Sequence, residues 1–196
     1  MRVVGGKYKS RLIAMPKGIR PTKDNVKEAL FNVLAKHVKG ARVLDLFAGS
    51  GAIGIEALSR DAERVVFADS SRNCTDCIDK NIRSLDEDAI FDNISILTKD
   101  IHQAIKHLSK EGEQFDIIFI DPPYNKGKVT APYHKNRIRK CLKNISIYDI
   151  LSSLGFLIVE HFKKDIIPEI EEDITLMRRL SYGDTVISIY KKSKKQ

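Results

Sequence analysis

One stretch of the chain, VLDLFAGSGAIGIEAL at residues 43–58, constrains the fold more than any other. It opens with a short apolar run at 43–47, which is typical of a strand buried in a parallel sheet. Three glycines follow, Gly49, Gly51 and Gly54, and the pattern then becomes helical. In a nucleotide-type loop the first glycine permits a tight turn, the second lets the backbone approach a ligand, and the third lets the helix pack on the strand. This spacing by itself most often indicates a dinucleotide site.

Asp45 lies inside the apolar run, four residues before the first glycine. A carboxylate contributes little inside a core strand, so we expect Asp45 to face a ligand at the strand's end. There it can accept hydrogen bonds, directly or through water, from an ammonium group such as that of S-adenosylmethionine. A dinucleotide would instead place its pyrophosphate at the N-terminus of the helix. The alternative role for Asp45 is a carboxylate that caps the loop.

From residue 42 onward, strand-like and helical patterns alternate, which predicts an α/β fold with a mostly parallel, twisted sheet. The predicted strands span residues 42–47, 64–68, 94–98, 115–120 and 156–159, and the helices lie near 51–60, 72–84, 101–110 and 137–153. Two last strands, 174–180 and 185–190, are separated by a Ser-Tyr-Gly-Asp turn and predict a C-terminal antiparallel hairpin. A small hairpin at 1–15 and a helix near 22–36 precede the sheet.

Carboxylates also follow the second and third predicted strands, where ligands of open α/β sheets bind. Asp69 follows Gly51 by eighteen residues, close to the spacing at which an acidic residue reaches a ribose hydroxyl. Asp100 stands where it can accept from an adenine amino group. Each residue has an alternative role as the N-cap of the next helix. For Asp69 that role is compatible with ribose binding.

The fourth strand is followed by Asp121-Pro122-Pro123-Tyr124. Consecutive prolines leave no N–H donors, so the nearby carbonyls can act as acceptors. The Asp121 carboxylate, the Pro122 carbonyl and the Tyr124 ring together suit a planar exocyclic amine, with two acceptors for its hydrogens and a stacking face for its ring. Positioning the amine would then favour its attack on a sulfonium methyl group, once the base has left its stack. The alternative is a proline-rich turn without chemistry.

The net charge of +8 is concentrated at one end of the chain. Residues 1–40 contain ten Lys and Arg against two acidic residues, and the rest of the chain is balanced. Such a cluster favours a polyanion as partner, and Lys7-Tyr8-Lys9 would offer phosphate contacts and an exposed stacking ring. The candidate RNA-binding residues are Arg2, Lys7, Tyr8, Lys9, Arg11 and Arg20. The alternatives are a merely solvated basic face, or a hairpin that only covers the sheet.

Three cysteines, Cys74, Cys77 and Cys141, are too few for a disulfide framework, and no second pair or histidine couple accompanies Cys74 and Cys77. We therefore expect no metal site and a reducing, cytoplasmic compartment. No apolar run approaches the roughly 20 residues that cross a membrane, and no signal peptide is evident. We expect a monomer that has no membrane partner.

The chain resembles the RsmD-type methyltransferases, which methylate guanine N2 in bacterial 16S ribosomal RNA. The resemblance lies in four blocks: Arg2-Val3-Val4-Gly5-Gly6-Lys7; Arg20-Pro21-Thr22-Lys23-Asp24 with Glu28-Ala29-Leu30-Phe31-Asn32; Asp45-Leu46-Phe47-Ala48-Gly49-Ser50-Gly51; and Asp121-Pro122-Pro123-Tyr124. It implies a Rossmann-like methyltransferase fold. It also implies that an S-adenosylmethionine site is lined by Asp45, Phe47, Gly49, Gly51, Asp69 and Asp100, with Arg20-Pro21-Thr22 closing over the methionine end. Asp121, Pro122 and Tyr124 would hold the guanine. Asn25 departs from the basic residue usual in the family.

The expected organisation is a basic RNA-contacting extension at 1–40, a methyltransferase domain at 41–190 and a basic tail at 191–196. Ribosomal RNA, or an assembling small ribosomal subunit, is the expected partner. The basic segment 126–143 is either an RNA-contacting loop or a solvated helix face. Three other functions compete: a DNA adenine-N6 methyltransferase, a non-catalytic RNA-binding assembly factor, and an NAD-dependent oxidoreductase. The first generally needs a separate target-reading region, and the other two leave Asp121 unexplained.

Overall fold

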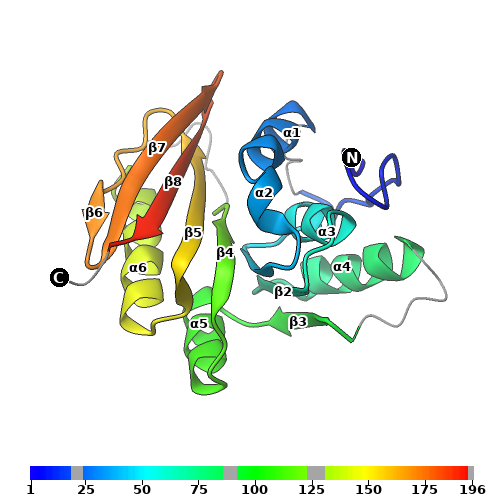
Figure 1. The fold of residues 1–196 in the computed structure, drawn as a ribbon, viewed down its shortest axis with the longest axis horizontal. Helices are drawn as coiled ribbons and strands as arrows, with labels where there is room; N and C mark the ends of the chain where they lie inside the picture. Colours follow the sequence, from blue (N-terminus) through cyan, green and yellow to red (C-terminus); the bar gives the residue numbers. More distant parts are fainter. Residues whose placement is uncertain (19–23, 86–91, 123–130, 194–196) are drawn as a thin grey trace. The chain divides into compact units, whose positions relative to one another are not determined.

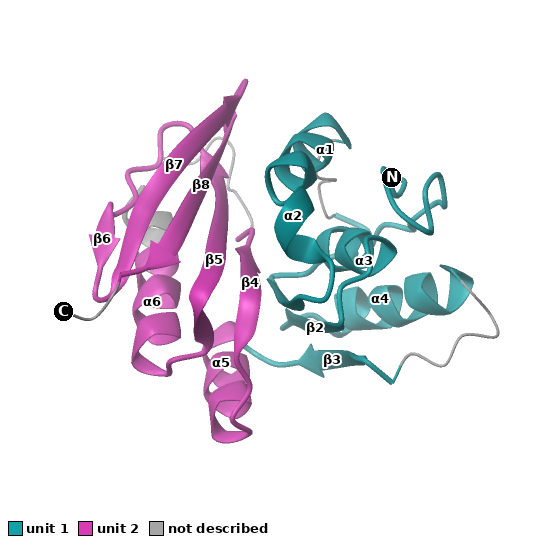
Figure 2. Cartoon of the chain, in the orientation of Figure 1, with its two compact units in different colours: residues 1–100 teal, residues 101–196 magenta. Residues whose placement is uncertain are grey.

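The computed structural model describes residues 1–18, 24–85, 92–122 and 131–193, with residues 131–136 described by their backbone alone. The chain forms two compact units, residues 1–100 and 101–196 (Figure 2). Each unit is described here by itself. The sequence-based boundary between an extension and a methyltransferase domain stays a prediction.

Unit 1 alternates helices with parallel strands (Figure 1). Its elements are α1 (Asp24–Val33), α2 (Ala35–Val38), β1 (Arg42–Leu46), α3 (Ala52–Ser59), β2 (Arg64–Asp69), α4 (Arg72–Leu85) and β3 (Ile94–Thr98). The strand order is β3-β2-β1, and both pairings are parallel. The three strands therefore lie within one or two residues of where the apolar runs predicted them.

The strands of unit 1 are mostly apolar, and helices pack against them and shield them from water. In β1 and β2 the interior positions are all buried. Helix α3 packs against β1 and β2, and α4 packs against β2 and β3. Every residue of α3 is buried, whereas α4 is amphipathic and buries Ile78, Ile82 and Leu85. A strand that has no solvent-facing side does not alternate apolar with polar residues, as a strand of an exposed sheet does. This explains the continuous apolar runs in the sequence.

Unit 2 begins with parallel strands and ends with antiparallel ones. Its elements are α5 (Ile101–Lys110), β4 (Phe115–Ile120), α6 (Ala131–Ile147), β5 (Leu151–Phe162), β6 (Ile170–Glu171), β7 (Ile174–Tyr182) and β8 (Thr185–Lys192). The order is β4-β5-β8-β7-β6, with β4 and β5 parallel and the later pairs antiparallel. The predicted C-terminal hairpin is confirmed, and its turn contains Gly183 at φ 65°.

Several element boundaries in unit 2 differ from the sequence-based prediction, including the start of β5, the end of α6 and the end of β8. Strand β5 begins at Leu151 rather than Phe156, because Leu151 pairs with Phe115 of β4. The residues up to 153 were predicted to be helical. Helix α6 accordingly ends at Ile147 instead of continuing to 153. Lys191 and Lys192 were predicted to lie in a frayed tail, but they belong to β8, where Lys191 pairs with Phe156.

The N-terminal arm, defined as residues 1–15, forms the predicted hairpin through an antiparallel bridge between Arg2 and Leu12. The prediction that Tyr8 is exposed is wrong: its side chain is 8% exposed. The main chain explains this burial, because the N–H groups of Lys7 and Tyr8 donate to the carbonyl and hydroxyl oxygens of Ser59 and hold the arm against α3. Tyr8 is therefore not available as a stacking platform for RNA bases.

We expect Gly6→Ala to destabilise the protein more than Gly40→Ala does. Both glycines have left-handed backbone, at φ 75° and 72°, where an alanine costs about 1–2 kcal/mol. A Cβ at Gly6 would lie 1.7 Å from the Ser59 carbonyl oxygen, whereas nothing lies within 4 Å of a Cβ at Gly40. Overpacking adds about 1–3 kcal/mol. Urea unfolding measures both losses, and equal losses would contradict the docking of the arm on α3.

Candidate functional site

The loop between β1 and α3 has an unusual backbone. Phe47, Gly49 and Gly51 have φ values of 62°, 56° and 76°, all in the left-handed region. Glycine adopts this region without strain, but a phenylalanine there is an outlier of the kind that gathers at binding sites. Gly51 is the N-cap residue of α3, so the loop delivers the chain directly into the helix. Main-chain N–H groups at such a helix start suit acceptor groups of a ligand.

Asp69 ties this loop to the end of β2. One of its carboxylate oxygens accepts the Gly49 N–H at 2.9 Å, and the other accepts the Ser71 N–H at 2.9 Å. The side chain is half-buried, and each oxygen keeps a lone pair for a further donor. The bond to Ser71 stabilises the turn before α4, but α4 begins at Arg72, so Asp69 lies ahead of the N-cap position that the alternative role predicted. A ligand diol can donate to the same carboxylate, so the two roles are compatible.

Asp45 lies behind the loop rather than on its open side. It is 3% exposed, and its Oδ2 accepts the Gly54 N–H at 3.0 Å. This contact is the loop-capping role that the sequence offered as an alternative. Burial raises the pKa of Asp45 from 3.8 to about 7; the bond from Gly54 opposes the rise and the charge of Asp69 adds to it. Contact between Asp45 and a ligand stays a prediction.

The second and third glycines both face the interior of unit 1. A Cβ at Gly54 would lie 2.2 Å from the Phe67 ring, so this glycine allows α3 to pack on β2, as predicted. A Cβ at Gly51 would meet Ile78 at 3.1 Å and Phe67 at 3.3 Å. The sequence had suggested that Gly51 leaves room for a ligand, but the side-chain direction at this position points into the protein.

The remaining predicted site residues lie at two strand ends or outside the described residues. Asp100 is exposed, and the preceding Lys99 donates its N–H to the Asp69 carbonyl at 3.1 Å. The structure thus places Asp100 near Asp69 at one end of the unit 1 sheet. In unit 2, Asp121 directly follows β4 and is half-buried, and Pro122 is buried. The predicted residues Arg20, Thr22 and Tyr124 lie outside the part of the chain that the structure describes.

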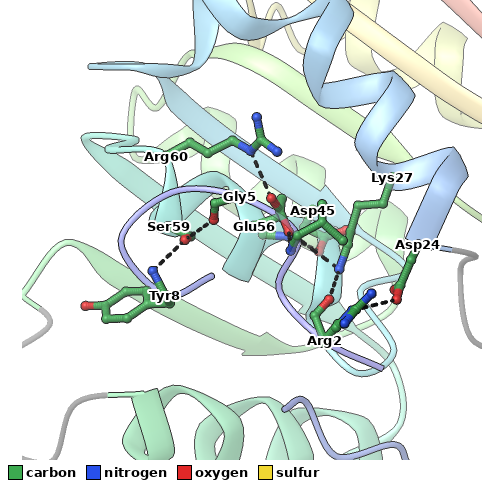
Figure 3. Close-up of polar contacts among 11 residues, drawn as sticks. Arg2, Gly5, Tyr8, Asp24, Lys27, Asp45, Glu56, Ser59 and Arg60 are labelled. Carbon is green, nitrogen blue, oxygen red and sulfur yellow. Dashed lines mark hydrogen bonds and ion pairs between the residues drawn. The ribbon is translucent and has the colours of Figure 1, made fainter. Parts of the chain in front are cut away.

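Sequence reasoning missed two buried polar residues beside the loop. Glu56 of α3 is fully buried, pairs with Lys27 at 3.5 Å and accepts the Val4 N–H at 2.8 Å (Figure 3). Asn81 of α4 is 3% exposed and donates to the Ser50 carbonyl at 3.0 Å. The available signal was the i, i+4 spacing of Glu56 and Arg60, which pair at 2.9 Å, but that spacing usually marks an exposed helix face.

Among the described residues, no three metal-binding side chains gather at one place, and the three cysteines are free thiols. None of the helices in the described ranges combines the length and the apolar character needed to span a bilayer.

We expect Asp45→Asn to become more stabilising, relative to the natural protein, as pH rises. In the unfolded chain Asp45 loses its proton near its ordinary pKa of 3.8, whereas the folded protein keeps it until about pH 7. The folded state binds more protons in this window, so its stability falls as pH rises through it. Asparagine keeps an acceptor for the Gly54 N–H but has no ionisable group, so its contribution to stability does not fall as pH rises. Urea unfolding of both proteins across the window tests the expectation, and a stability difference that does not depend on pH would contradict it.

Comparison with known proteins places this architecture in a family. The family model described as conserved hypothetical protein 95 matches residues 1–191. YlbH of Bacillus subtilis is 36% identical over 194 residues, which cover 98% of this chain and 99% of YlbH. Ribosomal RNA small subunit methyltransferase D of Buchnera aphidicola is 34% identical over 167 residues, covering 84% of this chain and 80% of that protein.

Solved structures with a similar fold are also described as methyltransferases. The yhhF protein of Escherichia coli has a TM-score of 0.80 and 26% identity, with 100% of this chain and 99% of that chain covered. SMU.776, solved in complex with SAH, has a TM-score of 0.63 and 19% identity over 88% of this chain and 50% of that chain. The Rossmann-like methyltransferase fold predicted from the sequence is thereby confirmed. Because the family model spans nearly the whole chain, the protein belongs to the conserved hypothetical protein 95 family, the RsmD family that its motifs resemble.

Proposed function

We propose that this protein transfers a methyl group from S-adenosylmethionine to the exocyclic N2 amine of a guanine in small-subunit (16S) ribosomal RNA. The proposal is carried by one observation: the family match over residues 1–191 contains both the left-handed glycine loop and the Asp121-Pro122-Pro123-Tyr124 segment. The name of the Buchnera relative, ribosomal RNA small subunit methyltransferase D, supports the RNA substrate, and the SAH bound to SMU.776 supports the cofactor.

The donor and acceptor groups of unit 1 fit this cofactor. S-adenosylmethionine, when bound, supplies an electrophilic methyl group on a positively charged sulfur. Asp69 has acceptor capacity left for the two ribose hydroxyls beyond its bonds to Gly49 and Ser71. The exposed Asp100 can accept from an adenine amino group. Asp45 contributes from behind the loop by fixing Gly54, and so the start of α3, in place.

The amine chemistry is assigned to unit 2. The N2 lone pair of guanine is delocalised into the ring, so the amine is a weak nucleophile. In this proposal the Asp121 carboxylate and the Pro122 carbonyl accept the two N–H groups, while Tyr124 stacks on the ring. This arrangement directs the nitrogen lone pair at the methyl carbon. As the N–C bond forms and the C–S electrons pass to sulfur, the amine releases a proton, which Asp121 is placed to accept.

RNA affinity is assigned to the exposed cations of the N-terminal arm. Arg2, Lys7, Lys9 and Arg11 all project from a segment whose apolar residues, Val3, Tyr8 and Ile13, are buried. The arm therefore combines a fixed backbone with exposed cationic side chains, one of which, Arg2, also pairs with Asp24 at 3.5 Å. Exposed cations on a fixed backbone suit contacts to phosphates. Stacking by Tyr8 forms no part of the proposal.

We expect Asp121→Ala to lower the rate of N2-methylguanosine formation by about 10²–10⁴, because it removes the group that positions the amine and accepts its proton. Affinity for S-adenosylhomocysteine should remain that of the natural protein. The matched control is Asp116→Ala, which removes a carboxylate from β4, the strand that Asp121 follows. Asp116 accepts a hydrogen bond from Ser152 at 3.0 Å. Digestion of the methylated RNA followed by nucleoside mass spectrometry measures the product. Natural turnover in Asp121→Ala, or N6-methyladenosine as the product, would contradict the proposal.

We also expect that replacing Arg2, Lys7, Lys9 and Arg11 together by glutamine weakens RNA binding and flattens its dependence on salt. Each phosphate contact contributes about 0.7–0.9 to the slope of log affinity against log salt concentration. The melting temperature should change little, because the four side chains are exposed. A control with the same loss of charge replaces four other exposed lysines: Lys80, Lys106, Lys110 and Lys164. An unchanged slope in the arm variant, or an equal effect in the control, would contradict the assignment.

A further inference from the structure

The N-terminal arm is held to unit 1 mainly through its own main-chain atoms. At its start, the Arg2 carbonyl accepts from Lys27 Nζ at 2.5 Å, and the Val4 N–H donates to the buried Glu56 at 2.8 Å. In its middle, the Ser59 hydroxyl donates to the Gly5 carbonyl at 2.5 Å (Figure 3). Glu56 and Ser59 lie on α3, the helix that the glycine loop enters. The start of the arm is thus attached to the element that follows the loop.

Asn81 attaches the other end of the arm to the glycine loop itself. Its Oδ1 accepts the Ala14 N–H at 2.9 Å, and its Nδ2 donates to the Ala14 carbonyl at 3.0 Å. The same Nδ2 donates to the carbonyl of Ser50, within the loop, also at 3.0 Å. Asn81 is 3% exposed and Ser50 is 4% exposed, so water does not substitute easily for the bond between them. Ala14 is exposed, and its two bonds to Asn81 are partly buried.

These bonds use both N–H donors of the Asn81 amide and one of the two lone pairs of its oxygen. The amide orientation is determined by its partners, because a flipped Asn81 would set its oxygen against two carbonyl oxygens and its NH₂ against an N–H. Aspartate, which has the same size, lacks both donors. One side chain therefore bonds at once to the arm and to the loop, and a displacement of either segment alone breaks part of its hydrogen-bond set.

We propose that Asn81 is a positioning residue that couples the arm to the glycine loop, so that RNA binding and cofactor binding strengthen each other. The inference rests on the proposed function, which assigns RNA to the arm and the cofactor to the loop. Ligand contact with the loop orders Ser50, Asn81 transmits that order to Ala14, and the arm presents its cations in one position. By thermodynamic reciprocity, RNA on the arm raises the affinity of the loop for cofactor by the same factor.

The test measures the affinity of full-length protein for transcribed 16S ribosomal RNA, with and without saturating S-adenosylhomocysteine. We expect S-adenosylhomocysteine to tighten RNA binding at least about fivefold in the natural protein, the lower end of the usual range for coupled sites. In Asn81→Asp this ratio should fall to about one, because the carboxylate keeps the acceptor for the Ala14 N–H but repels the carbonyls of Ala14 and Ser50. The control Asn93→Asp makes the same change at a residue that donates instead to the Glu63 carbonyl, and it should keep the natural ratio.

A second measurement needs no variant and covers the case in which Asn81→Asp does not fold. In the natural protein, S-adenosylhomocysteine alone should slow amide hydrogen exchange at Ala14 and Val4. A ratio of one in the natural protein, an unchanged ratio in folded Asn81→Asp, or unchanged exchange at Ala14 would overturn the coupling while leaving the proposed function intact. Failure of the natural protein to bind either S-adenosylhomocysteine or the RNA would overturn both.

Discussion

Unit 1 is organised around a carboxylate that has no access to water. Glu56 is fully buried, and it is matched by the equally buried Lys27, by Arg60 one turn along α3 and by a main-chain N–H of the arm. Burial lowers the pKa of Lys27, and the nearby charge of Glu56 opposes that effect. Removing one partner of such a buried pair costs about 3–5 kcal/mol, because the other charge is left without compensation. The position of α1, the arm and α3 relative to one another therefore depends on this cluster.

The three carboxylates of unit 1 that the sequence assigned to a ligand experience very different environments. Asp45 is almost fully buried, Asp69 is half-buried and accepts two main-chain N–H groups, and Asp100 is exposed. The increase in exposure from Asp45 through Asp69 to Asp100 parallels the change in proposed role from shaping the loop to binding a ligand. Asp45 fixes the start of α3 through Gly54, Asp69 fixes the loop through Gly49, and the proposed function assigns Asp69 and Asp100 to the cofactor.

The sequence was sufficient for features that depend on local chain properties. The apolar runs located β1, β2 and β4 because most residues of those strands are buried, and the glycine spacing located the turn into α3 because Gly54 must lie against Phe67. The family resemblance also came from contiguous motifs, and the comparisons confirm it. These features require no knowledge of which distant segments meet.

Features created by long-range contacts were not predictable in the same way. Tyr8 appeared to be a stacking ring because its neighbours are cations, yet Ser59, 51 residues away, holds it against α3. Asn81 showed no signal because its partners, Ala14 and Ser50, lie 67 and 31 residues away. The early start of β5 depended on the pairing of Leu151 with Phe115, a contact between distant residues that the predicted helix to residue 153 did not take into account.

The way in which the arm is docked has an evolutionary consequence. Apart from Gly6, whose missing side chain allows close approach to Ser59, and the exposed ion pair of Arg2 with Asp24, the main polar contacts that hold the arm involve its peptide groups. Every amino acid except proline supplies these groups in full. The exposed side chains at positions 2, 7, 9 and 11 can then diverge between lineages, or be exchanged by an engineer, while the docking contacts persist. Nucleic-acid preference and fold stability are thus encoded by different atoms of the same fifteen residues, and one can be altered with little effect on the other.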